Sequence, residues 1–161
     1  MSETDNDLRE LYQDMILDHG KRPRNFHVID PADCEAVGHN PLCGDKLVLF
    51  LRVGEDGRIA DAAFQGTGCA ISVASASMMT EMLKGKTAAE AKKLWAYFEA
   101  VCKSNATPAD MTEGLAEDDI DRLQALSGVR HYPVRVKCAT LAWRTLESAL
   151  DPKAVKKVAT E

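Results

Sequence analysis

Three cysteines and one aspartate are the residues of this chain best suited to chemistry. They belong to three short motifs: HNPLCGDK at 39–46, GTGC at 66–69 and RVKCATLAW at 135–143. In an extended segment, residues two apart point the same way, so Cys43 and Asp45 can bind one ion from the same side. With Cys69 and Cys138 they make three thiolates and a carboxylate, a plausible tetrahedral zinc set. Sulfur-rich ligation equally suits iron or an iron–sulfur cluster.

The predicted places of these thiols favour the reactive form. Cys69 stands at the start of a predicted helix and Cys138 in the opening turns of another. A helix N-terminus carries positive partial charge and unpaired N–H groups, and both favour the thiolate. Arg135 and Lys137 add positive charge beside Cys138. The alternatives are an Asx-turn bond for Asp45, a buried cap for Cys69 and a solvated helix-end charge for Arg135.

The number and spacing of the cysteines indicate whether they form disulfides. Five cysteines are an odd number, widely spaced, and the acidic, polar MSETDNDLRE lacks the features of a secretory signal. We therefore expect reduced thiols in the cytoplasm rather than a disulfide framework. Cys102 lies on the predicted inward face of a helix and is expected to be a small buried apolar residue.

Length and charge exclude other classes. A chain of 161 residues fits a single domain with a real core. A net charge of −5 argues against a nucleic-acid-binding surface, and no apolar run reaches bilayer length. His19, His39 and His131 are expected to be surface or hydrogen-bonding residues rather than ligands, and His27 gives no signal.

The first half of the chain predicts a helix and a small antiparallel meander. The helix follows Asp5-Asn6-Asp7, buries an apolar face from Leu8 to Ile16 and stops at Gly20. Strand formers at 47–53 and 58–65 flank a GEDG turn, and a weaker strand precedes them. The predicted strands occupy residues 34–38, 47–53 and 58–65.

The second half predicts helices. AISVASASMMTEMLK carries small residues and methionines at helical spacing, and the methionines are expected to fill the core. Thr87 and Glu90 fit a capping box, and Pro133 fits the first turn of the last helix. A loop or insertion is expected at 103–116, a short helix at 118–126, another loop before Pro133 and a frayed tail after Pro152.

The motifs in this order resemble the NifU-N/IscU-like family of iron–sulfur cluster assembly proteins. The resemblance covers about residues 8–150 of a single domain spanning 1–161, behind an N-terminal LYQDMILDHGKRPRNF. Within the family it is similar to the SufU type, because Lys137 stands where IscU-type proteins carry histidine and extra sequence falls near residues 102–127. The resemblance implies an α+β SufE/NifU (IscU-like) fold, with a three-stranded antiparallel sheet and helices packed on one face.

The resemblance also implies a function. It implies zinc held by Cys43, Asp45, Cys69 and Cys138, and sulfur transfer from a SufS-like, pyridoxal-phosphate cysteine desulfurase toward downstream iron–sulfur assembly machinery. Cys43 would accept the sulfur, and Arg135 would help to position the partner or the zinc site. Whether such a relay protein counts as an enzyme, a sulfurtransferase, is left open.

Three other functions are weighed. A scaffold that assembles and transfers a [2Fe–2S] cluster would use the same cysteines. A zinc deaminase needs H-x-E and P-C-x-x-C elements, and neither occurs here. A zinc-stabilised binding module would lose its fold, and not merely its activity, when stripped of metal. A redox enzyme is poorly supported because no CxxC occurs.

Overall fold

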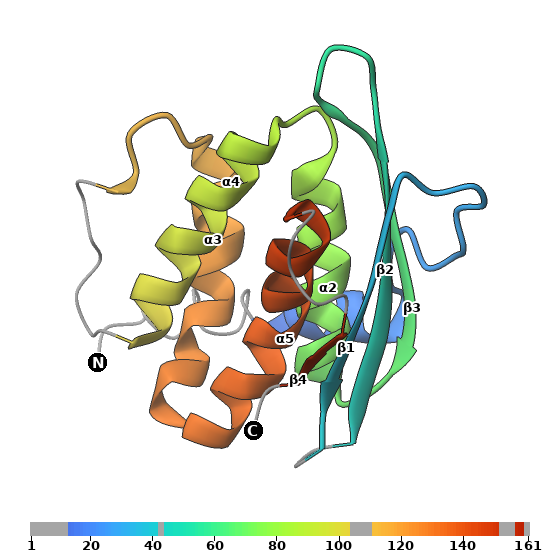
Figure 1. The fold of residues 1–161 in the computed structure, drawn as a ribbon. Helices are drawn as coiled ribbons and strands as arrows, with labels where there is room; N and C mark the ends of the chain where they lie inside the picture. Colours follow the sequence, from blue (N-terminus) through green and yellow to red (C-terminus); the bar gives the residue numbers. More distant parts are fainter. Residues whose placement is uncertain (1–12, 42–43, 104–110, 152–156, 160–161) are drawn as a thin grey trace.

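A computed structural model describes residues 13–41, 44–103, 111–151 and 157–159 of the chain. Its framework is an antiparallel meander of three strands (Figure 1): β1 (Cys34–Asn40), β2 (Asp45–Val53) and β3 (Ile59–Thr67). A short strand, β4 (Lys157–Ala159), pairs in parallel with β1, so the sheet order is β3-β2-β1-β4. The three-stranded meander is confirmed, whereas the prediction of a frayed tail is wrong for residues 157–159.

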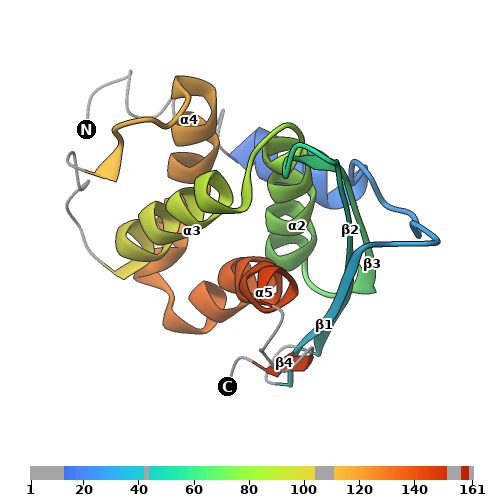
Figure 2. The same cartoon turned by 45° about the horizontal axis from the view of Figure 1, so that its top comes forward.

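The helices form two layers on one face of the sheet (Figures 1 and 2). They are α2 (Ala70–Leu83), α3 (Ala88–Lys103), α4 (Glu117–Leu126) and α5 (Pro133–Leu150). α2 and α5 lie against the strands, and α3 and α4 lie behind them. On the opposite face, Ile29 from the segment before β1 packs on Phe50 and Ala63. The α+β fold with helices on one face is confirmed.

Alternation along β2 builds the core. Leu47, Leu49 and Leu51 point at the helices and are fully or almost fully buried. From α2 they meet Met78 and Met82, which belong to the same cluster of buried residues. The prediction that the methionines fill the core is therefore confirmed.

The predicted helix boundaries hold closely. Thr87 Oγ1 accepts the Glu90 N–H at 3.2 Å, which is half of a capping box, while the Glu90 carboxylate pairs with Arg58 at 3.5 Å. Pro133 starts α5 as predicted. Most of the segment expected to be a loop before Pro133 is instead a 3₁₀ helix, η2 (Ser127–His131), which follows α4 directly.

The helical segment 13–21 is anchored to α2. His19 Nδ1 lies 2.7 Å from Ser77 Oγ, and Gly20 lies so close to Ala70 that an added Cβ would stand 3.3 Å from the Ala70 Cβ. His19 is buried and hydrogen-bonded, as expected. The segment therefore packs along the first half of α2, from Ala70 to Ser77.

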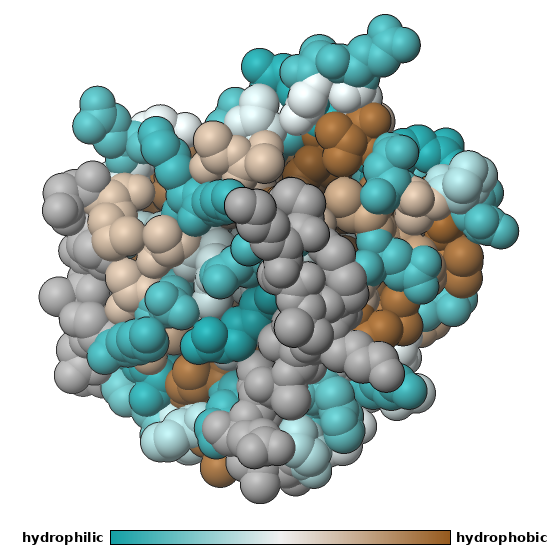
Figure 3. Space-filling model, viewed as in Figure 1, coloured by the Kyte–Doolittle hydropathy of each residue, from teal (hydrophilic) through white to brown (hydrophobic). Residues whose placement is uncertain are grey.

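The surface is mixed in character. In Figure 3, hydrophobic residues form separate patches among polar ones. No helix in the described ranges has the length and apolar character needed to cross a bilayer.

Candidate metal centre

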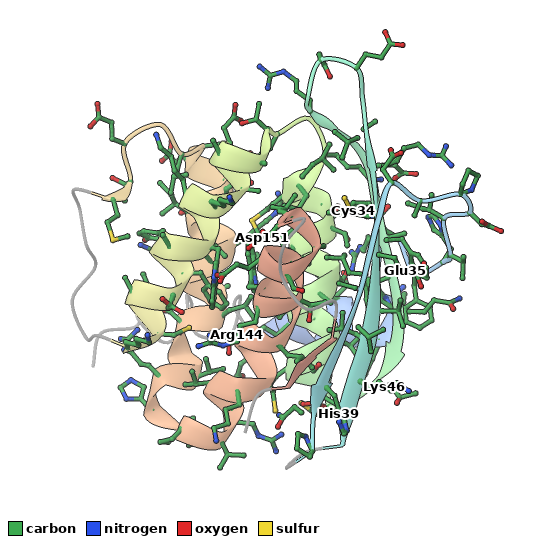
Figure 4. All side chains as sticks on the ribbon, viewed as in Figure 1. Cys34, Glu35, His39, Lys46, Arg144 and Asp151 are labelled. Carbon is green, nitrogen blue, oxygen red and sulfur yellow. The ribbon has the colours of Figure 1, made fainter. Side chains whose placement is uncertain are left out.

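Three of the four predicted ligands meet at the end of the sheet where β1 is followed by β2. Asn40 and Asp45 face each other in the strand register, and the next pair, His39 and Lys46, marks this end of the sheet in Figure 4. β3 ends at the same end of the sheet, so α2, which follows β3, starts beside Asp45. α5 carries Cys138 into the same region. The Asp45 carboxylate and the thiols of Cys69 and Cys138 offer ligand atoms that all lie within 4.8 Å of one another.

Asp45 is wholly buried, yet its carboxylate has two protein donors. Oδ1 accepts the backbone N–H of Cys69 at 2.9 Å, and Oδ2 accepts Nδ2 of Asn40 at 3.1 Å. The first bond joins segments far apart in sequence and is not the local Asx-turn bond considered above. A buried carboxylate is costly unless it is hydrogen-bonded and paired with positive charge. Two neutral donors supply the hydrogen bonds, and a cation would supply the charge.

Asn40 is a site residue that sequence reasoning missed. Its Nδ2 also lies 3.6 Å from Cys138 Sγ, so one amide contacts both the carboxylate and a thiol. The side chain is fully buried, and among the described residues its Oδ1 has no hydrogen-bond partner. The available signal was an asparagine at a strand end, immediately before the proline of HNPLCGD.

The two thiols differ in access. Cys69 is the N-cap residue of α2; its side chain is half-buried and makes no capping hydrogen bond. Cys138 is fully buried on α5, and its Sγ lies 3.7 Å from the Val134 carbonyl oxygen. The centre is therefore closed on the α5 side and more open beside Cys69.

Because Gly68 has no side chain, the backbone there can pass close to the Asp45 carboxylate. A Cβ at this position would lie 2.6 Å from Asp45 Oδ1, closer than real Cβ contacts allow. The short GTGC segment thus brings the Cys69 N–H and thiol to the same carboxylate.

Comparison with known proteins identifies the fold and the family. Residues 11–139 match the family described as NifU-like N terminal domain. The chain belongs to this family. It is 39% identical over 146 residues to the zinc-dependent sulfurtransferase SufU of Bacillus subtilis, covering 89% of this chain and 91% of that protein. It is also 39% identical over 147 residues to the iron–sulfur cluster assembly scaffold protein IscU of Streptococcus pyogenes, covering 91% and 87%.

Solved structures of the family agree with the fold. A putative iron–sulfur cluster assembly scaffold protein for the SUF system from Fervidobacterium islandicum superposes with a TM-score of 0.74 at 32% identity, over 89% of this chain and 98% of that one. A NifU-like protein from Brucella abortus has a TM-score of 0.74 at 22% identity, covering 89% and 94%, which supports the fold alone. The protein is thus an iron–sulfur cluster assembly protein of the SufU/IscU family.

The family implies a metal, and the described residues fit one. Two thiols and a carboxylate are donors that zinc accepts, and the clustering of their ligand atoms needs no rearrangement of distant elements. A bound cation would neutralise the buried Asp45 carboxylate. The cation and its remaining ligands would also give polar contacts to Asn40 Oδ1, which has no hydrogen-bond partner among the described residues.

The fourth predicted ligand, Cys43, lies outside the described residues, so its role stays a prediction. Its neighbour Gly44 has φ of +70°, a conformation that L side chains rarely adopt. Gly44 therefore forms part of a tight turn between β1 and β2.

The remaining predicted residues lie around the centre or away from it. Arg135 is exposed on the first turn of α5 and is not among the clustered ligands, and Lys137 is half-buried one residue before Cys138. Cys102 is buried, as predicted, and this burial raises the pKa of its thiol to about 12, which keeps it protonated and unreactive. His27, His39 and His131 are exposed and lie outside the clustered group.

Proposed function

We propose that this protein is a zinc-dependent sulfur acceptor that takes persulfide sulfur from a SufS-like cysteine desulfurase and passes it to iron–sulfur assembly. The observation that carries the proposal is the clustering of the Asp45, Cys69 and Cys138 ligand atoms within 4.8 Å, with the carboxylate wholly buried. A single carboxylate among thiolates is a weaker ligand than a fourth thiolate. Such a site suits a centre that must release a ligand in order to work.

Lys137 favours sulfur transfer over cluster assembly. It stands beside Cys138, where a histidine would offer an additional imidazole ligand. A protonated lysine has three donors and no lone pair, so it cannot ligate a metal. The zinc-dependent relative from Bacillus subtilis, similar over most of both chains, supports the same choice.

The transfer step itself needs no net oxidation. The thiolate of Cys43 attacks the terminal sulfur of the desulfurase persulfide and forms a new S–S bond. The S–S bond to the desulfurase cysteine breaks, and that cysteine leaves as a thiolate. One thiolate is consumed and one is released, so electrons and charge balance.

When bound, zinc would keep a cysteine thiolate deprotonated while restraining its nucleophilicity. The protein's own residues then determine access. Two hydrogen bonds hold the Asp45 carboxylate in place: Asn40 Nδ2 donates one, and the Cys69 backbone N–H donates the other. In this proposal Arg135, exposed one turn before Cys138, would help to position the partner or the zinc site.

The test is desulfurase turnover with and without this protein, comparing wild type with Cys43→Ala. Wild type is expected to accelerate cysteine turnover, because it removes the persulfide that otherwise occupies the desulfurase. Cys43→Ala is expected to give no acceleration, because no acceptor thiol remains in the turn. Cys102→Ala is the matched control and should behave as wild type, since Cys102 is buried in the core.

Equal stimulation by wild type and Cys43→Ala would remove Cys43 from this role. The scaffold function predicts a different result. Anaerobic reconstitution would then give a stable [2Fe–2S] spectrum and transfer of the cluster to an apo-acceptor. The Streptococcus pyogenes relative is named as an assembly scaffold. Zinc retention with sulfur acceptance and no transferable cluster supports our proposal.

A further inference from the structure

The two described thiols of the metal centre differ in their hydrogen bonds. Nδ2 of the fully buried Asn40 lies 3.6 Å from Cys138 Sγ and donates to it. Cys69 meets Asp45 through its backbone N–H instead, and its thiol makes no capping hydrogen bond at the start of α2. The amide of Asn40 therefore distinguishes Cys138 from Cys69.

Asp45 determines the orientation of this amide. An ionised carboxylate accepts hydrogen bonds and cannot donate them, so the Asn40 atom 3.1 Å from Asp45 Oδ2 is Nδ2 and not Oδ1. The NH₂ group carries two hydrogens, one for the carboxylate and one for Cys138 Sγ. The reversed amide would place its oxygen against a carboxylate and a thiolate, which would repel it. The donor that faces Cys138 therefore follows from the charge of its neighbours.

A donated N–H weakens a thiolate as a nucleophile. The hydrogen bond stabilises the negative charge on the sulfur, and a stabilised thiolate attacks a disulfide or persulfide sulfur more slowly. Cys138 is also 0% exposed, whereas Cys69 is half-buried. Burial prevents attack while the centre is closed. The hydrogen bond would persist when a partner opens the centre, because it joins β1 to α5 inside the fold.

We propose that Asn40 is a positioning residue that acts through Cys138 and determines which thiol accepts sulfur. Its N–H keeps the Cys138 thiolate on the metal and out of the transfer step, so that Cys138 is a permanent ligand. Attack by Cys138 on a persulfide would spend the sulfur charge that the Asn40 N–H stabilises, and the charge-assisted bond would be lost. The inference rests on the proposed sulfur transfer and explains how a centre with several thiols directs the incoming sulfur away from α5.

The test is alkylation of the zinc-loaded full chain by iodoacetamide, with peptide mass mapping of the initial rates at Cys69 and Cys138. Zinc is kept in excess so that the centre stays occupied in every variant. Metal-bound thiolates are already deprotonated, so the rates compare nucleophilicity and access rather than ionisation. In wild type, Cys138 should react more slowly than Cys69. In Asn40→Ala, the Cys138 rate should rise roughly tenfold, the effect of one charge-assisted hydrogen bond, while the Cys69 rate stays near that of wild type.

Cobalt(II) substitution gives a spectroscopic readout of the same bond. A hydrogen bond to a thiolate stabilises its lone pairs, so removing the donor should move the sulfur-to-cobalt charge-transfer band to lower energy in Asn40→Ala. Asn40→Ser is a second variant with a shorter side chain, and it should show the same rise in rate and the same band shift. Thermal melts establish which variants are folded at the temperature of the assay.

Thr140→Ala is the matched control for loosened packing. Thr140 is buried on α5 two residues after Cys138, and its Oγ1 donates to the Val136 carbonyl oxygen at 2.8 Å. Its removal disturbs the same stretch of helix and leaves Asn40 in place, so the Cys138 rate and the cobalt band should match wild type.

The proposal is overturned if wild-type Cys138 reacts as fast as Cys69, or if the folded Asn40 variants keep the wild-type Cys138 rate or the wild-type cobalt band. An equal rise of the Cys138 rate in Thr140→Ala would also overturn it, because packing would then be the cause. No desulfurase is present, so these outcomes are separate from a failure of sulfur acceptance, which the turnover assay with Cys43→Ala detects.

Discussion

At the scale of single residues, the centre depends on an amide as well as on its ligands. Asn40 donates to Asp45 Oδ2 and also approaches Cys138 Sγ, so it orients a ligand from each of two elements. Groups that hold metal ligands in place typically change metal affinity by about 10–100-fold when removed. Asn40 is therefore expected to matter for metal binding although it is not one of the predicted ligands.

Asn40→Ala is predicted to weaken zinc binding by roughly 10–100-fold, because the Asp45 carboxylate loses a donor and gains freedom to turn. Competition against a chromophoric chelator measures this affinity. His39→Ala is the control: His39 is the preceding residue, exposed on the outer face of β1, and its removal should leave affinity unchanged. Equal affinities for Asn40→Ala and wild type would show that the hydrogen bond does not orient the ligand.

At the scale of elements, the centre exists because three chain segments approach closely at glycines. Gly68 crosses the Asp45 carboxylate, and Gly20 lets segment 13–21 pack on the first turn of α2. Gly38 similarly lies where a Cβ would stand 2.1 Å from Thr145 Oγ1 of α5. Small residues at these crossings determine how close β1, α2 and α5 come to one another.

Gly68→Ala is predicted to destabilise the protein by about 1–3 kcal/mol and to reduce zinc content, since its Cβ would meet Asp45 Oδ1. Urea unfolding and metal analysis measure the two effects. Gly128→Ala is the matched control, because a Cβ there meets no atom within 4 Å, and it should be neutral or slightly stabilising. Similar losses in both variants would mean that the contact with Asp45 is not the cause.

At the scale of the whole molecule, segment 13–21 is attached through a buried histidine. Burial is the main cause that lowers the pKa of His19, and the Arg24 charge adds to it. Glu81, whose Oε1 lies 3.6 Å from Nε2, and Asp18 act in the opposite direction, while Arg122 adds weakly to the lowering. Ser77 Oγ accepts the Arg24 N–H and can donate its own proton to Nδ1, which requires neutral histidine.

Stability should therefore fall on mild acidification. The unfolded chain takes up a proton at His19 near its ordinary pKa of 6.5, whereas the folded state takes it up only at lower pH. The free energy of unfolding then decreases as pH falls below about 6.5 and levels off once the folded state is also protonated. Asp18, whose pKa is lowered chiefly by its hydrogen bond with Arg24, loses its contribution only below its ordinary value of 3.8.

The measurement is urea unfolding of metal-free protein between about pH 7.5 and 5, for wild type and His19→Gln. The variant lacks the titrating group, so its stability should change less over this interval. Chelating the metal removes the pH dependence of metal binding, in which protons compete with the metal for its ligands. Parallel curves for the two proteins would show that His19 does not cause the acid sensitivity.

Much of the fold follows from local sequence. The alternation in LVLFLRV, the threonine that caps α3 and the proline that starts α5 determine elements through interactions within a few residues, and they lie where predicted. The burial of Cys102 follows from its place on an apolar helix face. Such features are readable because their physical causes are local.

Both the sequence motifs and the tertiary packing were needed to identify the metal centre. The motifs identified Asp45, Cys69 and Cys138 as candidates, but their clustering required β3, α2 and α5 to pack against one another. The tertiary structure alone revealed the position of Asn40 between Asp45 and Cys138, and the pairing of β4 with β1. Each of these depends on contacts between residues far apart in the chain, and such contacts are determined by packing and not by any pattern of neighbouring residues.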